Sequence, residues 1–372
     1  MPTALEDLGW NDALEREFRK RSQGQTVVPA LVTGDLGISY EVLLQEGVWT
    51  EAELAGRLFH EAQVQADLPA VGDWVLLKEA PDAERVGWRV VARLARRSRF
   101  SRKVPGRGTE EQVIAANVDA VVIVTDAEVD FNPRRIERFL MLAARGGCQP
   151  WIWVNKADLV AEERQAHRVA ELQTLLGAPE RVLSVSAVTG EGLEAFRRQL
   201  GPGRVFTLVG SSGVGKSSLV NRLLGEARQA IGEVSEATGK GRHTTTRRFL
   251  LPLKGGGVLI DNPGIREVQL WTDEETLREA FQDLEVLAAE CRFRDCRHQG
   301  DAGCRIEAAI AQGELSPERY ENYLALEDEI ALLQKRQARW KSNFERVMKR
   351  EKKIEARNPG DRFYDPLSEL ED

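Results

Sequence analysis

The sequence is poor in cysteine and methionine and has no long apolar run. Of 372 residues, four are cysteine and three are methionine. No stretch approaches the ~18–20 apolar residues that a membrane-spanning helix needs. The first residues, MPTALEDLGW, have neither the basic nor the apolar segment of a signal peptide. These absences exclude a membrane protein and a disulfide-stapled secreted domain, and we expect a cytoplasmic protein.

An excess of positive charge is also absent. The formal net charge is −7, which argues against a uniformly basic nucleic-acid binder, so any RNA contact has to come from local patches. One basic segment, at 334–357, includes Trp340 and Phe344. The other surrounds Phe100, and either a solvated linker or a nucleic-acid face on a small barrel would explain it. Its basic residues are Arg93, Arg96, Arg97, Arg99, Arg102, Lys103 and Arg107.

Length and pattern predict a multi-domain chain. Short apolar runs separated by Gly, Asp and Pro predict a small all-β barrel at 25–105, after an N-terminal extension at 1–24. Alternating apolar strands and helical stretches predict an α/β domain with a parallel sheet at 106–270. The remainder, 271–372, is predicted to be mainly helical and to end in an acidic tail.

A phosphate-binding loop follows the apolar strand VFTLV and precedes the helical segment SLVNRLL. Its sequence, GSSGVGKS, matches G-x-x-x-x-G-K-[ST] in the strand-loop-helix setting that this motif requires. The glycines let backbone N–H groups face the phosphates, Lys216 neutralises their charge, and Ser217 offers a hydroxyl to Mg²⁺. The expected nucleotide-binding residues here are Gly210, Ser211, Ser212, Gly213, Val214, Gly215, Lys216, Ser217 and Ser218.

Two further segments predict that the base is guanine. Asn155-Lys156-Ala157-Asp158 ends the strand WIWV and is similar to the N-K-x-D element of GTPases. The carboxylate of Asp158 would accept hydrogen bonds from the guanine N1–H and 2-amino group, which adenine lacks. Ser186-Ala187-Val188 ends the next strand and is similar to the S-A-x loop that backs the base. Both elements stand at strand ends, where ligands of α/β sheets bind.

Metal and switch elements follow the phosphate loop. Asp261-Asn-Pro-Gly264 matches D-x-x-G, so Asp261 is expected to reach Mg²⁺ through water and the Gly264 N–H to sense the γ-phosphate. The Thr-rich segment 238–247 lies between the two motifs, and Thr246, with Thr245 as the runner-up, is expected to close over Mg²⁺. A polar loop that binds nothing would explain the same residues. The predicted Mg²⁺ ligands are Ser217, Thr246 and Asp261.

The position that orients the attacking water in many switch GTPases is a Gln, but this chain has Ile265 there. Intrinsic hydrolysis is therefore expected to be slow. His243 is the candidate catalytic residue, with Lys240 and Arg242 as charge stabilisers and Lys216 and Thr246 at the phosphates. A loop histidine without a catalytic role is the alternative.

The order of these motifs is unusual. The base-reading elements come first and the phosphate and switch elements second, the reverse of an ordinary GTPase. One parallel sheet can hold both orders if the termini are joined and reopened elsewhere, because termini lie at the surface. The sequence thus predicts a circularly permuted GTPase.

Three of the four cysteines cluster with a histidine. Cys291-x4-Cys296-x-His298-x5-Cys304 is a Cys₃His set, which in a cytosolic chain predicts one closed structural Zn²⁺ site. Redox cysteines lack a C-x-x-C here, and incidental core cysteines would leave His298 unexplained. Cys148, alone in an apolar stretch, is expected in the core.

Longer strings resemble one family, the bacterial circularly permuted ribosome-small-subunit-dependent GTPases. They include EQVIAANVDAVVIV, NKAD, GSSGVGKSS, TGKGRHTTT, DNPGIRE, CRFRDCRHQGDAGC and SPERYENYLAL, and they cover nearly the whole chain. The resemblance implies an OB-fold barrel, a permuted GTPase core and a zinc domain. It also implies binding to the 30S subunit and 16S rRNA, ribosome-stimulated GTP hydrolysis to GDP, and a role in late subunit maturation. We expect a monomer.

Two other classes of function compete with this interpretation. A GTP-dependent switch acting on a protein partner would leave the basic segments merely solvated, whereas the first interpretation requires salt-dependent RNA binding. A P-loop ATPase or small-molecule kinase is disfavoured by Asp158 and by the lack of a lid-like substrate motif.

Overall fold

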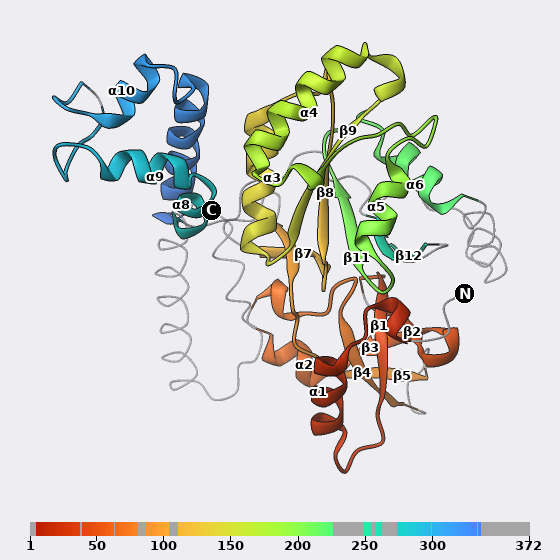
Figure 1. Ribbon diagram of the computed structural model, residues 1–372. Helices are drawn as coiled ribbons and strands as arrows, with labels where there is room; N and C mark the ends of the chain where they lie inside the picture. The colour runs from red at the N-terminus through yellow and green to blue at the C-terminus, as the bar shows by residue number, and fades with distance from the viewer. Residues whose placement is uncertain are drawn as a thin grey trace, which may run out of the picture. The chain divides into compact units, whose positions relative to one another are not determined.

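The computed structural model describes residues 5–37, 39–62, 64–80, 87–103, 111–225, 249–253, 257–261, 274–298, 300–332 and 334–335. The chain divides into two compact units. The first holds a barrel and an α/β domain, and the second holds the C-terminal helices (Figure 1). The exact limits of the predicted domains stay a prediction.

A five-stranded barrel forms the first part of the chain. It closes in the order β1-β2-β3-β5-β4, with β3 and β5 parallel and the other pairs antiparallel, an arrangement of the OB type. The strands are β1 Val28–Asp35, β2 Ser39–Leu44, β3 Trp49–Leu54, β4 Trp74–Glu79 and β5 Trp88–Arg93, with short helices η2 Gln45–Gly47, α2 Gly56–Glu61 and η3 Gln65–Asp67. The predicted small barrel is therefore confirmed.

Small and branched apolar side chains fill the barrel, as alternation along its strands requires. The buried set is Ala30, Val32, Tyr40, Val42, Ala52, Val75, Leu77 and Val90. The first strand is buried along nearly all its length, because its outer side also packs near β12 of the α/β domain. The barrel and the α/β domain therefore share an interface within the first unit.

The N-terminal segment packs on the barrel. Helix η1 covers Leu5–Leu8 and helix α1 covers Asp12–Ser22. Asn11 caps α1 by accepting hydrogen bonds from the Ala13 and Leu14 amides, at 3.0 and 3.1 Å. The Trp10 ring meets Trp74 of β4 edge-on, with 4.8 Å between centroids.

A six-stranded sheet forms the α/β domain, in the order β10-β9-β8-β11-β13-β12. All neighbouring strands are parallel except β12, which runs antiparallel to β13. Helices α3 and α4 cover one face and α5 and α6 the other (Figure 1). The strands are β8 Ala120–Asp126, β9 Gln149–Asn155, β10 Val182–Ser184, β11 Val205–Val209, β12 Phe249–Pro252 and β13 Val258–Asp261, and the helices are α3 Pro133–Arg145, η4 Ala157–Leu159, α4 Glu162–Leu176, η5 Pro179–Arg181, α5 Leu193–Leu200 and α6 Lys216–Leu224.

Phe196 of α5 lies at the centre of an aromatic cluster on one face of this sheet. Its ring lies edge-on to Trp151, Trp153 and Phe206, with centroid distances of 5.2, 4.7 and 5.0 Å. Side chains of α6, including Leu219, join the same core. This packing fixes α6, and with it the loop that precedes α6, against the sheet.

The junction between barrel and α/β domain contains a buried ion pair. Arg96 donates to Asp73 at 2.6 Å, and the two side chains are 7% and 0% exposed. Arg96 also donates to the carbonyls of Ala66 and Leu68, at 2.6 and 2.8 Å. The interpretation of Arg96 as part of a solvated linker or nucleic-acid face is therefore wrong, because a partner 23 residues away in the sequence holds it inside the fold.

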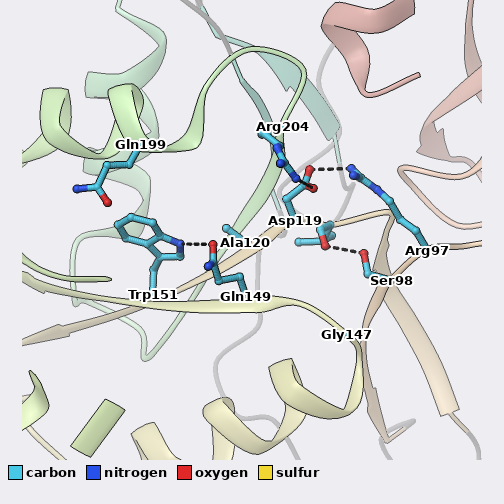
Figure 2. Close-up of a pocket in the computed structure, with 10 residues that line it drawn as sticks. Arg97, Ser98, Asp119, Ala120, Gly147, Gln149, Trp151, Gln199 and Arg204 are labelled. Carbon is cyan, nitrogen blue, oxygen red and sulfur yellow. Dashed lines mark hydrogen bonds and ion pairs between the residues drawn. The ribbon is translucent and has the colours of Figure 1, made fainter. Parts of the chain in front are cut away.

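Asp119 organises the neighbouring part of this junction, close to the two-stranded sheet of β6 Arg99–Lys103 and β7 Glu111–Ala116. Its carboxylate accepts from Arg97 at 2.7 Å and from Arg204 at 2.8 Å, as Figure 2 shows. These residues line a polar pocket of about 400 Å³ at the amino ends of β8 and β9. Arg97, too, is thus engaged within the protein.

The second unit consists of helices around the cysteine cluster, as predicted. They are α8 Glu274–Ala280, α9 Gln282–Ala289, α10 Arg305–Ala311 and a helix that begins at residue 317. Phe281 meets Tyr323 edge-on at 5.5 Å, and Arg319 pairs with Asp283 at 2.7 Å.

The basic segment with Trp340 and Phe344 and the acidic tail lie outside the described residues. Among the described helices, none is long and apolar enough to cross a membrane.

Candidate nucleotide-binding site

The predicted site residues converge because four parallel strands end at the same edge of the sheet. The phosphate loop follows β11, the Asn155 segment follows β9, and Asp261 ends β13. The strand between β9 and β11 is β8, which ends at Asp126. The register pairs Asp126 with Asn155 across β8 and β9, so motifs from distant parts of the sequence meet in one crevice.

Glycine is required at two positions of the phosphate loop. Gly210 has φ of 140°, and a Cβ there would collide with the Val124 carbonyl of β8. Gly215 has φ of 99°, and a Cβ there would collide with the side-chain amide of Asn155. These backbone conformations strain any other residue, so the motif glycines let the loop lie close against β8 and against the end of β9.

Lys216 begins α6 and folds back over the loop. Its ammonium donates to the carbonyls of Gly210 and Ser211, at 2.7 and 2.6 Å. Ser217 and Ser218 follow in the first turn of α6 and are exposed. The loop thus presents a cation, hydroxyls and a helix N-terminus together, an arrangement suited to phosphate.

Asn155 joins three loops. Its amide nitrogen donates to the Val214 carbonyl of the phosphate loop at 2.8 Å, and its amide oxygen accepts from the Ala187 N–H at 3.2 Å. The residue is 1% exposed. Asn155 therefore links the loop that follows β11 to the loop that follows β10, with both ends of its amide engaged.

Asp158 is held in place by Ser186. The Ser186 hydroxyl donates to the Asp158 carboxylate at 2.5 Å, and it accepts from the Val188 and Thr189 amides at 3.2 and 3.1 Å. Asp158 is exposed. An exposed carboxylate that is fixed on one side offers acceptors to a planar donor pair such as the guanine edge.

Lys156, between Asn155 and Asp158, pairs with Asp126. Its ammonium lies 2.9 Å from the Asp126 carboxylate. Burial alone would raise the pKa of Asp126, but hydrogen bonds from the Asp130 amide, Lys156 and the Glu128 amide outweigh it, and the pKa is lowered. Asp126 was not among the predicted residues, although it also ends an apolar strand at the site edge.

Arg222 of α6 is a second residue at the site that was not predicted from the sequence. It donates to the Thr189 carbonyl at 2.8 Å, and it lies so close to Gly190, at φ of 86°, that a Cβ there would touch the guanidinium. It ties the helix behind the phosphate loop to the turn behind Ser186. No local pattern marks it, because its partner lies 33 residues away.

Asp261 lies at the end of β13, beside the strand that leads into the phosphate loop. The Thr207 hydroxyl of β11 donates to the carbonyl of Ile260, the residue before Asp261, at 2.9 Å.

Several predicted residues lie outside the described residues. They are Lys240, Arg242, His243, Thr245, Thr246, Gly264 and Ile265.

Comparison with known proteins agrees with this site. A family model described as RsgA GTPase matches residues 93–271. The protein named "Small ribosomal subunit biogenesis GTPase RsgA" from Opitutus terrae is 42% identical over 369 residues, which are 95% of this chain and 99% of the relative. This chain belongs to the RsgA GTPase family. It is accordingly a GTP-hydrolysing enzyme with a circularly permuted order of motifs.

A second relative is similar in sequence, and two solved structures are similar in fold. The RsgA of Syntrophotalea carbinolica is 43% identical over 88% of this chain and 90% of the relative. The crystal structure of YjeQ from Thermotoga maritima superimposes with a TM-score of 0.58 and 27% identity, over 82% of this chain and 99% of that chain. YloQ, a circularly permuted GTPase, matches in fold with a TM-score of 0.55 at 22% identity over 82% of this chain and 95% of that chain.

The second unit of this RsgA family member brings four potential metal ligands together. The ligand atoms of Cys291, Cys296, His298 and Cys304 all lie within 4.8 Å of one another. His298 Nδ1 is 3.6 Å from the Cys291 sulfur and 3.4 Å from that of Cys304. A tetrahedral Zn²⁺ with bonds of about 2.1–2.3 Å sets its ligands about 3.4–3.8 Å apart. The two His298 distances lie in this range, which makes the four residues a candidate site for one Zn²⁺.

Backbone groups around the cluster also suit thiolates. The Arg305 amide donates to the Cys291 sulfur at 3.3 Å, and the Glu307 amide donates to Cys304 at 3.5 Å. Cys304 thereby caps helix α10. In the first unit, by contrast, burial raises the pKa of Cys148 to about 12, which agrees with its predicted place in the core.

Proposed function

We propose that this GTPase reads guanine through Asp158 and binds the phosphates through the loop at 210–218. The observation that carries this proposal is the Ser186–Asp158 hydrogen bond of 2.5 Å. It holds a carboxylate at the sheet edge where the phosphate loop also lies. Adenine would leave the Asp158 carboxylate without hydrogen-bond donors. This would cost about 1–3 kcal/mol of binding free energy, so Asp158 can favour guanine over adenine.

Magnesium and catalytic roles follow from the same loops. Ser217 would supply a hydroxyl to Mg²⁺ and Asp261 a carboxylate, with Thr246 completing the set. Lys216 and the Gly264 N–H would contact the β- and γ-phosphates, and Mg²⁺ would neutralise charge that develops there. His243 would orient the attacking water, since Ile265 has no group that can do so.

The work that hydrolysis serves is, we propose, assembly of the small ribosomal subunit. The names of the relatives from Opitutus terrae and Syntrophotalea carbinolica, at 42% and 43% identity, support this role. We place the chain on the 30S subunit, in contact with 16S rRNA, as a cytoplasmic monomer whose hydrolysis is stimulated by the subunit. Exposed aromatic side chains on the barrel, Trp49 and Phe59, are 36% and 62% exposed and suit stacking on unpaired bases.

The test is GTP hydrolysis by the purified chain alone, with isolated 30S subunits and with isolated 50S subunits. We expect stimulation by 30S and none by 50S. The Lys216→Ala variant controls for contaminating GTPases in the subunit preparation and should show no stimulated hydrolysis. GTP binding without stimulation by either subunit would favour a switch that acts on a protein partner.

A further inference from the structure

We propose that Asp126 is a positioning residue for the guanine base, because its ion pair with Lys156 fixes the carbon stem of Lys156 as a floor of the base pocket. This inference rests on the proposed base-reading role of the Asn155–Asp158 segment. Asp126 itself would make no contact with the nucleotide. Its effect on binding would pass entirely through Lys156.

The two oxygens of Asp126 have separate tasks. Oδ1 accepts from the Glu128 and Asp130 amides, at 3.1 and 2.8 Å, and so shapes the turn after β8. Oδ2 accepts from the Lys156 ammonium at 2.9 Å. The carboxylate is 5% exposed, and the turn holds it, so the point at which it anchors Lys156 is fixed by the backbone.

The backbone of Lys156 also indicates a functional position. Lys156 has φ of 64°, in the left-handed region, and a residue other than glycine there costs about 1 kcal/mol. The residue lies between Asn155, which bonds to the phosphate loop, and Asp158. Its side chain is 33% exposed while its ammonium is anchored, which leaves the carbon stem as the part that can face a ligand.

Anchoring matters because lysine is otherwise flexible. Ordering a free lysine side chain costs up to about 2 kcal/mol, and a ligand that needs the stem in one place would have to overcome that cost when it binds. The ion pair orders the stem before the nucleotide arrives. Preorganisation of this kind raises affinity without any new contact to the ligand.

The variant Asp126→Asn separates the two tasks. Its amide oxygen can take the place of Oδ1 and keep the turn, whereas its NH₂ group would face the Lys156 ammonium and cannot accept from it. We expect GDP to bind about tenfold more weakly, the size of a lost charge-assisted hydrogen bond. The KM for GTP should rise by a similar factor, and kcat at saturating GTP should stay near that of the wild type.

Glu128→Gln is the matched control. It removes one carboxylate charge from the same turn, where Glu128 pairs with Arg164 across an exposed surface at 2.7 Å. The backbone N–H of residue 128 still donates to Asp126 Oδ1. GDP affinity within about twofold of the wild type is expected, because exposed pairs contribute little. A tenfold loss in this variant too would mean that net charge, and not Lys156, explains the effect, and would overturn the proposal.

A double-mutant cycle tests whether Asp126 acts through Lys156. Lys156→Met keeps a carbon stem and removes the ammonium, so it should also weaken GDP binding, and adding Asp126→Asn should then cause no further loss. Full additivity, or wild-type affinity in Lys156→Met, would overturn the proposal. The Lys156→Met arm stands alone if Asp126→Asn does not fold. A wild-type chain that binds no GDP would instead overturn the proposed function itself.

Discussion

Asn155 donates a 2.8 Å hydrogen bond to the Val214 carbonyl, and this bond connects the half of the site that we propose reads the base to the half that we propose binds phosphate. The two residues lie 59 positions apart. In a circularly permuted chain the two halves are joined in the reverse order, so contacts of this kind have to hold the crevice together. Arg222 and its bond to the Thr189 carbonyl make a second such connection.

Replacing Asn155 by Ala should loosen both loops. It leaves the buried Val214 carbonyl and the Ala187 amide without their partner, which should lower the free energy of unfolding by about 1–3 kcal/mol and weaken GDP binding as well. Urea unfolding and GDP titration measure the two effects. Asn132→Ala is the control, since it removes the cap of α3, costs about 1 kcal/mol and should leave GDP affinity unchanged. Unchanged GDP affinity in Asn155→Ala would contradict the linking role.

Ser186→Ala should weaken nucleotide binding, and it should also lower the free energy of unfolding by about 1–3 kcal/mol because the Val188 and Thr189 amides lose their acceptor. Without the hydroxyl, Asp158 is free to rotate, and we expect the KM for GTP to rise about tenfold, as for the loss of a hydrogen bond to a charged group. The rate at saturating GTP should change little. Ser184→Ala is the control, because that hydroxyl accepts from Gln165 at 3.0 Å, away from Asp158. Equal KM values in the two variants would argue against a role for Ser186 in holding Asp158.

Those parts of the site that are written as contiguous motifs could be predicted from the sequence. The phosphate loop, the Asn155–Asp158 segment and the cysteine cluster each need fixed spacing, so their chemistry is visible in short strings. Asp126 and Arg222 escaped notice because their partners are 30 and 33 residues away. The sequence of the barrel strand β3, WTEAEL, is half polar, so no apolar run marks this strand.

Arg96 is a charged residue whose role also depends on a partner that is distant in the sequence. In the sequence it belongs to a basic run typical of a linker or an RNA surface. In the fold it is buried with Asp73, whose position beside it depends on closure of the barrel. Only the tertiary structure could have distinguished it from the exposed arginines around it.

Arg96→Met should therefore destabilise the first unit strongly. It leaves Asp73 buried without its cation, and breaking a buried pair by removing one partner costs about 3–5 kcal/mol. Urea unfolding followed by tryptophan fluorescence reports this, since Trp74 adjoins Asp73. Arg57→Met removes the exposed pair with Glu61 and should have no measurable effect. A similarly small effect for Arg96→Met would contradict the structural role of that pair.

Removal of metal should affect the second unit alone. We expect one Zn²⁺ per chain by elemental analysis, and none in a Cys296→Ser variant, because three remaining ligands do not close a structural site. A strong chelator should reduce helical circular dichroism, since metal binding and folding are linked in such sites. GDP affinity should persist. Cys148→Ala is the control and should retain its zinc; loss of metal there would contradict the assignment of the four ligands.

The central claim is that Asp158 reads guanine in a hydrolase that the small subunit stimulates. It is tested most directly by measuring hydrolysis of GTP and of xanthosine triphosphate by Asp158→Asn in the presence of 30S subunits. Xanthine has a 2-oxo group where guanine has an amine, so the amide of Asn can donate to it. We expect the variant to lose 30S-stimulated hydrolysis of GTP and to gain 30S-stimulated hydrolysis of xanthosine triphosphate. GTP hydrolysis at the wild-type rate by this variant would contradict it.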